Sequence, residues 1–146
     1  MREKILFIGG SLNQTRMMYK ISQQLAYTYD CYFTPYYADG FVNKLAQWGL
    51  LEMTVLGSRH QNDTLSFIKD HDLPLDWRGE SNDYDLVVTG SDLIVQKNIR
   101  GKRVVLLQDG IPDPKSFLFY LVKWLRLPRY LANSSAIGLS NKYDIF

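Results

Sequence analysis

Three carboxylates follow short apolar runs of this chain, and they are its first candidates for chemistry. Asp39, Asp92 and Asp109 each stand beside a glycine or a serine, after residues that favour a β-strand. A carboxylate at the end of a strand can accept a proton from a substrate or bind a ligand. It can also cap the next turn or helix, so both interpretations stay open at these positions.

A glycine turn after the first apolar run is the second candidate. Residues 5–8 are four consecutive apolar residues, which predicts a strand that is buried on both faces. The residues that follow allow a sharp turn or offer polar atoms at the start of a helix: Gly9, Gly10, Ser11, Asn13, Gln14 and Thr15. We expect them to line a cleft for a small or anionic ligand. The turn matches neither the dinucleotide fingerprint nor the phosphate-loop motif, so a plain connection from strand to helix is the alternative.

Two later segments repeat this form. Residues 84–92 and 102–110 are each a short apolar run that ends in small residues, followed by a side chain able to bind a ligand. In the second segment Gln108 and Gly110 flank Asp109, and the glycine would let a ligand approach the backbone closely. These runs predict an α/β fold with a Rossmann-like, doubly wound and mostly parallel sheet that carries helices on both faces.

The elements between these runs can be placed from residue spacing. A period near 3.6 predicts a helix over residues 16–25, whose apolar positions are Met17, Met18, Ile21 and Leu25. The remaining segments are predicted as a strand ending at Pro35 (29–37), a helix (41–51), a polar loop (58–63), a helix capped by Asn62 or Asp63 (64–71) and an extended piece around Pro74 (73–77).

Length and composition limit the class of protein. The chain has 146 residues, the size of one domain, and its hydrophobic content of 46% excludes a disordered protein. The net charge of +2 is too small to indicate a nucleic-acid partner. Cys31 is the only cysteine, so no intramolecular disulfide can form, and no metal-ligand spacing is present. His60 and His71 lie in polar segments and are interpreted as surface residues.

The C-terminal part of the chain carries two expectations of its own. Residues 115–129 are apolar and basic, which fits either a helix at the inner face of a membrane or a helix buried in the protein. Because no signal peptide and no run of about 18 apolar residues occurs, we expect a cytoplasmic protein whose membrane contact is peripheral. Residues 141–146 resemble residues 82–87, which open a strand, so we expect the chain to be a piece of a longer protein.

The glycine turn, the run over residues 84–92 and the segment over residues 106–114 together resemble the N-terminal half of GT-B type glycosyltransferases. The most similar subset is related to UDP-N-acetylglucosamine 2-epimerase and CDP-glycerol glycerophosphotransferases. The resemblance covers nearly the whole chain and implies one domain, residues 1–146, that binds the acceptor. The missing partner would be a C-terminal domain that holds the nucleotide-sugar. The basic, apolar residues 115–129 would suit a lipid-linked or envelope-polymer acceptor.

The same resemblance implies a mechanism. Transfer of a sugar needs a base that deprotonates the acceptor hydroxyl, and no cofactor is implied. Asp109 is the first candidate for this base, Asp92 the second and Asp39 the third. Gln108, Gly110 and the residues of the glycine turn would bind the ligand.

Two functions of other classes stay open. The spacing of Ser11 and Thr15 after the first strand also resembles the phosphate-holding turn of flavodoxin-like FMN reductases, although the aromatic loop that holds the flavin ring in those proteins is absent. The second alternative is a non-catalytic interaction domain, since the aromatic content of 14% would supply rings for a docking surface.

Overall fold

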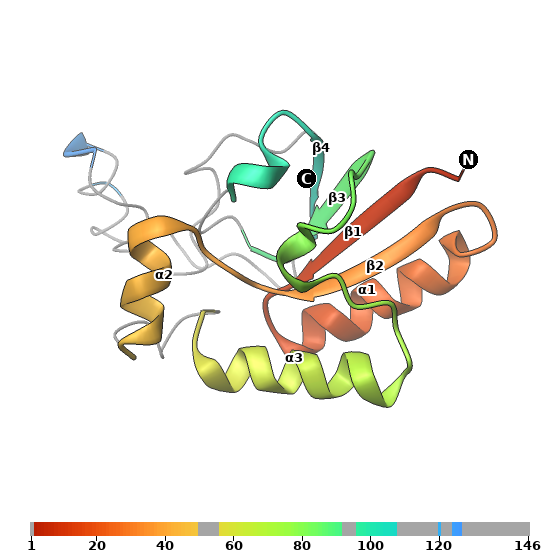
Figure 1. The fold of residues 1–146 in the computed structure, drawn as a ribbon, viewed down its shortest axis with the longest axis horizontal. Coiled ribbons are helices and arrows are strands. Elements are labelled where there is room, and N and C mark those ends of the chain that lie inside the picture. Colours follow the sequence, from red (N-terminus) through yellow and green to blue (C-terminus); the bar gives the residue numbers. More distant parts are fainter. Residues whose placement is uncertain (1, 50–55, 92–95, 108–119, 121–123, 127–146) are drawn as a thin grey trace.

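Four parallel strands form the sheet at the centre of the molecule, in the order β2-β1-β3-β4 (Figure 1). A computed structural model of the chain describes residues 2–49, 56–91, 96–107, 120 and 124–126. Its elements are β1 (Lys4–Gly9), α1 (Leu12–Leu25), β2 (Asp30–Pro35), α2 (Gly40–Gln47), α3 (Ser58–Asp70), the 3-10 helix η1 (Trp77–Gly79), β3 (Leu86–Thr89), the 3-10 helix η2 (Lys97–Ile99) and β4 (Arg103–Leu106). The prediction of a Rossmann-like α/β fold with a parallel sheet is confirmed.

The strand β1 lies between two partners and is buried on both faces, as its apolar run predicts. Its side chains alternate, with Ile5 and Phe7 in the hydrophobic cluster on one face and Leu6 and Ile8 in the cluster on the other. None of these four side chains is more than 1% exposed. A strand without a polar face has to pair on both edges and pack on both faces, which fixes its central place.

The helices α1 and α3 cover the first face and lie side by side beneath the sheet (Figure 1). Met18 of α1 and Ile68 of α3 join the cluster of Phe7 and Phe33, whose rings stack with their centroids 5.1 Å apart. This cluster fixes both helices against β1 and β2.

The predicted apolar stripe of α1 is only partly correct, because Met18 is buried and Leu25 packs against the same cluster but Ile21 is exposed. The buried side chains of the helix are Gln14, Thr15, Met18 and Ser22, and Ile21 is 37% exposed. The tight glycine turn places the first turn of α1 so close to β1 that small and polar side chains fill the contact. Apolar periodicity therefore predicted Met18 and Leu25 correctly but missed the polar residues of the buried face.

Among the described residues, the second face is covered by the 3-10 helices, loop residues and Leu45 of α2. Leu6 and Ile8 pack there against Tyr36, Tyr84 and Ile99. The 3-10 helix η1 approaches this face closely, because a side chain at Gly79 would meet Leu6 at less than 3.0 Å. Gly79 satisfies two requirements, because it can adopt the φ of 60° that this turn needs and it has no side chain that would clash with Leu6.

A single bridge beyond β2 reveals the winding of the sheet. Leu75 pairs with Phe33 in parallel, the Phe33 N–H donates to the Pro74 carbonyl at 2.8 Å and the Asp76 N–H donates to the Phe33 carbonyl at 3.0 Å. The extended conformation predicted around Pro74 is thus confirmed. If Leu75 is counted as a strand, the order becomes the 3-2-1-4-5 of the doubly wound Rossmann fold.

The position of α3 agrees with this winding. Crossovers between parallel strands are right-handed, so a helix that leads outward from β2 lies on the face of α1, and the return over β1 lies on the opposite face. Helix α3 shares the face of α1, and η1 makes the return. In the flavodoxin order, 2-1-3-4-5, the helix after β2 would lie on the face opposite α1.

The predicted loop over residues 58–63 is wrong, because α3 already begins at Ser58. Its inward contacts in this part are polar: the Gln61 side chain donates to the Tyr36 carbonyl at 3.2 Å. The buried residues Thr64 and Ile68 follow only later. Because the first residues of α3 show no periodic pattern of apolar residues, the sequence does not predict where this helix begins.

Candidate functional site

The carboxyl edge of the sheet gathers most of the predicted site residues that the structure describes. All strands point the same way, so the glycine turn after β1, Asp39 beyond β2 and Gly90 after β3 follow strand ends on one edge. In open α/β sheets this edge is the usual place of ligands. Two regions of this edge differ in how they use their polar side chains. We call the region between the ends of β1 and β3 the switch-point crevice, and the cavity at the end of β2 the β2-end pocket.

The switch-point crevice lies between the ends of β1 and β3 and is bridged by Gln14. The Gln14 amide accepts from the Ser11 N–H at 3.1 Å and donates to the Gly90 carbonyl at 2.7 Å. The Ser11 hydroxyl in turn accepts from the Gln14 N–H at 3.3 Å, which completes a capping box at the start of α1. Gln14 therefore links the turn after β1 to the residue that follows β3.

Two glycines let the parts of the crevice meet. A side chain at Gly90 would come within 3.0 Å of the Gln14 amide, and one at Gly9 would come within 3.0 Å of the Thr15 hydroxyl. That hydroxyl donates to the Ser11 carbonyl at 2.8 Å and lies 3.3 Å from the hydroxyl of Thr64. These glycines serve close packing within the protein.

The residues predicted to line a cleft have unequal exposure. Gly10, Gln14 and Thr15 are buried, Ser11 is half-buried and Asn13 is exposed. The polar atoms of Gln14 and Thr15 contact other parts of the protein. A ligand at this turn would meet Asn13 and the outer side of Ser11.

The β2-end pocket is an open cavity of about 350 Å³ between the end of β2, α2, the start of α3 and η1. Its polar lining consists of amides, hydroxyls and one cation, and its apolar lining is largely aromatic. The lining residues are Thr34, Pro35, Tyr36, Tyr37, Asn43, Gln47, Gly49, Leu56, Ser58, Gln61, Trp77 and Arg78. Cavities of this size and mixed character hold small molecules.

Arg78 is the charged residue of this lining, and its backbone is strained. Its φ of 62° is left-handed, a conformation that non-glycine residues adopt at a cost of about 1–3 kcal/mol. The Arg78 N–H donates to the Thr34 hydroxyl at 3.0 Å, and the Asn98 amide donates to the Arg78 carbonyl at 2.9 Å. These bonds fix the backbone of Arg78 beside the pocket that it lines, and its guanidinium lies 5.4 Å from the centroid of the Tyr37 ring.

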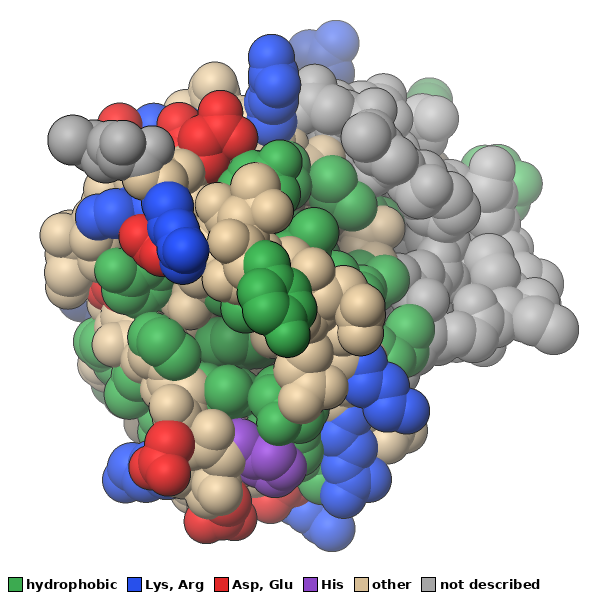
Figure 2. All heavy atoms as spheres, turned by 90° about the vertical axis from the view of Figure 1, so that its right-hand side faces the viewer, with side chains coloured by type: hydrophobic (Ala, Val, Ile, Leu, Met, Phe, Trp, Pro, Cys, Tyr) green, Lys and Arg blue, Asp and Glu red, His purple; other side chains and the backbone are tan. Residues whose placement is uncertain are grey.

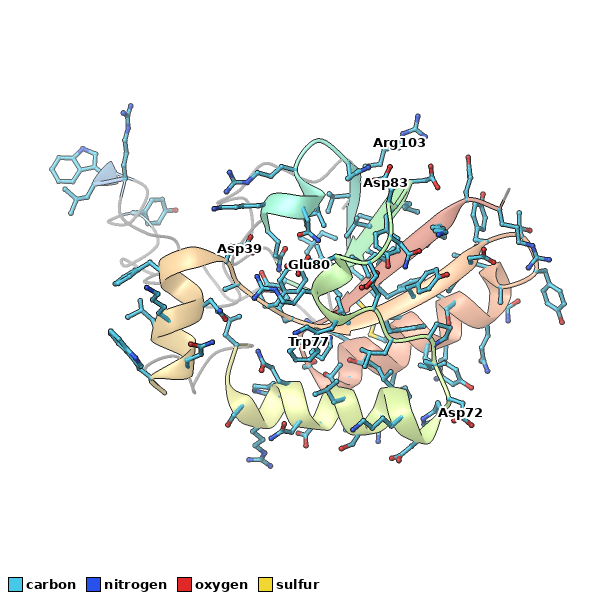
Figure 3. The ribbon with its side chains drawn as sticks, in the orientation of Figure 1. Asp39, Asp72, Trp77, Glu80, Asp83 and Arg103 are labelled. Atoms are coloured by element: carbon cyan, nitrogen blue, oxygen red, sulfur yellow. The ribbon has the colours of Figure 1, made fainter. Side chains whose placement is uncertain are left out.

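Two carboxylates pair with this guanidinium. Asp39 Oδ1 accepts from Arg78 Nη2 at 2.9 Å, and Glu80 Oε1 accepts from Arg78 Nε at 3.0 Å. The other oxygen of Asp39 accepts from the Lys97 N–H at 2.6 Å. Figure 3 shows Asp39 and Glu80 in the same region, above Trp77. Both oxygens of Asp39 are thus engaged, so this residue positions Arg78.

Tyr37 and Trp77 give the pocket its rings. Burial raises the pKa of the Tyr37 phenol, which stays protonated and donates to Asn98 Oδ1 at 2.7 Å. Trp77 is 52% exposed, so a large part of its ring is open to a ligand.

A buried carboxylate holds η1 in place. Asp76 is 3% exposed and accepts hydrogen bonds from the Ser81 N–H, the Asn82 amide and the Tyr84 hydroxyl. Burial alone would raise the pKa of this carboxyl, but the three donors outweigh it and hold the pKa below its ordinary value. Asp76 therefore stays ionised and fixes the segment that carries Trp77 and Arg78.

The opposite end of the molecule has a groove of about 510 Å³ beside the start of β2. Figure 2 views the molecule from the end where the N-terminus lies, and hydrophobic side chains gather there with charged ones around them. The groove is lined by Tyr19, Tyr29, Cys31 and His71 among others. Burial, and then the charge of Asp30, raise the pKa of the Cys31 thiol, so it stays protonated. The groove has no activated nucleophile among its described residues.

The two histidines lie on α3 and just after it. His60 is half-buried, and His71 is exposed and stacks on Phe67 with the ring centroids 3.9 Å apart. No group of three or more His, Cys, Asp or Glu residues in the described part of the chain could hold a metal ion. Within the same ranges no helix has the length and hydropathy needed to cross a bilayer.

Four predicted site residues lie outside the described residues: Asp92, Gln108, Asp109 and Gly110. Residues 141–146 and most of 115–129 do so as well. Their roles stay predictions.

Sequence reasoning missed the main features of the β2-end pocket. Trp77 and Arg78 lie in a connection that the sequence marks only as extended around Pro74. The glycine that follows Arg78 was the one available signal of an unusual turn there. The amides of Asn43, Gln47 and Gln61 carry no motif. Comparison of the chain with protein-family models, with curated proteins and with solved structures gives no match.

Proposed function

We propose that this chain is the acceptor-binding domain of a GT-B type glycosyltransferase and that the β2-end pocket holds the acceptor. The observation that carries the proposal is the lining of that pocket, in which amide side chains stand beside an open tryptophan ring at the carboxyl edge of a parallel sheet. The resemblance described above suggests the class of transfer.

The lining suits a sugar for chemical reasons. A sugar hydroxyl both donates and accepts hydrogen bonds, and so do the side-chain amides of Asn43, Gln47 and Gln61. The ring of Trp77 offers a flat apolar surface to the C–H groups on one face of a pyranose.

The catalytic base is proposed to be Asp109, with Asp92 as the second candidate. In the sequence both come shortly after the end of a strand, since β3 ends at Thr89 and β4 at Leu106. A positioned base contributes a factor of about 10² to 10⁴ to the rate of such a reaction.

The test uses the protein encoded by the complete reading frame that contains this chain. It is incubated with a panel of nucleotide-sugars and simple glycoside acceptors, and the products are identified by mass spectrometry. We expect transfer of a sugar, and a kcat that falls by about 10² to 10⁴ in Asp109→Asn. The matched control Asp63→Asn removes an exposed carboxylate on α3 and should leave kcat unchanged.

Three results would contradict the proposal. Absence of transfer with every donor of the panel would remove the assigned reaction. Full activity of both Asp109→Asn and Asp92→Asn would remove the assigned base. A purified protein that is yellow and absorbs in the flavin band would favour an FMN-binding protein.

A further inference from the structure

The charged residues around the β2-end pocket limit which ligands can bind there more strongly than the shape of the pocket does. Among the described lining residues Arg78 is the only charged one, and the other polar side chains are amides and hydroxyls. A free guanidinium in such a cavity would indicate a phosphate or a carboxylate as the ligand.

This guanidinium is not free, however. Arg78 Nη2 pairs with Asp39 at 2.9 Å and Arg78 Nε pairs with Glu80 at 3.0 Å. The three groups together carry one net negative charge. The Arg78 and Asp39 side chains are only 23% and 21% exposed, so solvent screens their pair less than it screens a surface pair.

Asp39 and Glu80 are not among the lining residues, but a phosphate group that reached Arg78 would find this cation already paired with both carboxylates. It would lose its own hydration without gaining a full ion pair, and the like charges would repel it. A hydroxyl group avoids this cost, because it can donate to a carboxylate and accept from the remaining guanidinium N–H.

The start of α3 does not change this balance. Gly57 provides no side-chain cap for the helix, and Ser58 lines the pocket. The partial positive charge of a helix N-terminus attracts anions but equally orients the oxygen of a neutral hydroxyl. The single net negative charge of Arg78, Asp39 and Glu80 outweighs this partial charge.

We propose that the β2-end pocket selects a neutral, hydroxyl-rich ligand such as an unphosphorylated sugar unit, and that Asp39 and Glu80 exclude phosphorylated ligands by neutralising Arg78. This inference rests on the proposed function, because it specifies the acceptor for that site. The cavity volume of about 350 Å³ is near the lower end for small-molecule sites and favours a single unit.

The test compares matched neutral and phosphorylated probes. Binding of methyl β-glucoside, glucose 1-phosphate, glycerol and glycerol 3-phosphate to the 146-residue chain is followed by ¹⁵N–¹H correlation spectra at low ionic strength. We expect methyl β-glucoside to shift the side-chain signals of Trp77 and Gln61, and to bind at least about fivefold more tightly than glucose 1-phosphate.

Removal of a single negative charge next to Arg78 gives a second test. Glu80→Gln removes one of the two carboxylates that pair with Arg78, and Glu80 is 59% exposed, so the fold should tolerate the change. We expect this variant to bind glucose 1-phosphate about 3- to 10-fold more tightly than the wild type and methyl β-glucoside unchanged. The control Asp83→Asn makes the same change of net charge at a carboxylate that pairs with Lys102 and lies away from the pocket (Figure 3).

The role of the ring is tested by Trp77→Ala, which should weaken methyl β-glucoside binding by about 5- to 10-fold. Tyr27→Ala is its control, since Tyr27 is 87% exposed and does not line the pocket. Equal losses in both variants would contradict a stacking role of Trp77.

The outcomes separate this inference from the proposed function. Tighter binding of glucose 1-phosphate to the wild type at this pocket would overturn the inference while leaving an acceptor site in place. Binding of neither sugar would overturn both. Equal effects of Glu80→Gln and Asp83→Asn would show that net charge of the whole chain decides, and would overturn the selection by Asp39 and Glu80.

Discussion

The switch-point crevice and the β2-end pocket lie on the same edge of the sheet, yet they use polar side chains in opposite ways. In the crevice, Gln14 turns its amide inward and joins Ser11 to Gly90. In the pocket, the amides of Asn43 and Gln47 line an open cavity. Position at the carboxyl edge therefore does not decide function, because the same residue type can stabilise the fold or face a ligand.

The comparison makes a general prediction. Changes in the crevice should lower stability and leave ligand binding intact in the molecules that fold, whereas changes in the pocket lining should do the reverse. Exceptions are expected only where a pocket residue is held by a buried network.

Gly90→Ala should have the largest effect on stability. The new methyl group would lie within 3.0 Å of the Gln14 amide and force it away from both of its partners. We expect a loss of about 3 kcal/mol in the free energy of unfolding, measured by denaturant unfolding.

Gly101→Ala is the control for this change. Gly101 has a φ of 81° but open space around its Cβ position, so only the backbone cost of about 1 kcal/mol should appear. Losses of the same size in both variants would mean that the crevice is not closely packed.

Gln14→Leu should lower the free energy of unfolding by about 2 kcal/mol. The side chain keeps its size, but the Ser11 N–H and the Gly90 carbonyl lose their partner in a partly buried place. Binding of methyl β-glucoside should remain within about twofold of the wild type. If Gln14→Leu were as stable as the wild type, water would replace the hydrogen bonds of the Gln14 amide at no cost.

Asp76→Asn should lower stability by about 1–2 kcal/mol at pH 7, because a neutral amide accepts more weakly from Tyr84, Asn82 and Ser81. The pKa of Asp76 is lowered in the folded protein, so its contribution is present above the unfolded pKa of about 4 and is lost as the pH falls through the folded pKa.

The pH dependence checks this assignment. Unfolding curves between pH 7 and pH 3 should show the wild type losing its advantage over Asp76→Asn on acidification. If the difference between the two proteins stayed constant down to pH 3, the ionised carboxylate would not be the stabilising group.

Gln47→Ala should have the smallest effect on stability, less than about 0.5 kcal/mol, because Gln47 is an exposed residue in the last turn of α2. Its effect should appear in binding of methyl β-glucoside at the β2-end pocket. A large loss of stability without a change in binding would reverse the comparison between the two regions.

The sheet was predictable because its signals are local. The apolar runs of β1, β3 and β4 and the Pro35 that ends β2 fix each strand, and strands of this kind pair in parallel. The start of α3 was not predictable, since its inward contacts in residues 58–63 are polar and leave no period. The polar part of the buried face of α1 was missed because close packing against Gly9 favours small and polar side chains there.

The candidate site was predictable only in its location. A common edge for the strand ends follows from the parallel order, and Asp39 was correctly placed on it. That Asp39 holds Arg78, whose backbone is left-handed, depends on contacts between residues 39 positions apart. No pattern within a short stretch of sequence encodes such a contact.

The capping box of Ser11 and Gln14 has a consequence for how the protein behaves when empty. Many nucleotide-binding loops become ordered when they bind a phosphate. Here the Gln14 side-chain oxygen already accepts from the Ser11 N–H, which an anion would otherwise bind. The amide protons of Ser11 and Gln14 should therefore exchange slowly with solvent whether or not any ligand has been added. This turn is therefore ordered without a ligand, and ligand binding is expected at the β2-end pocket instead.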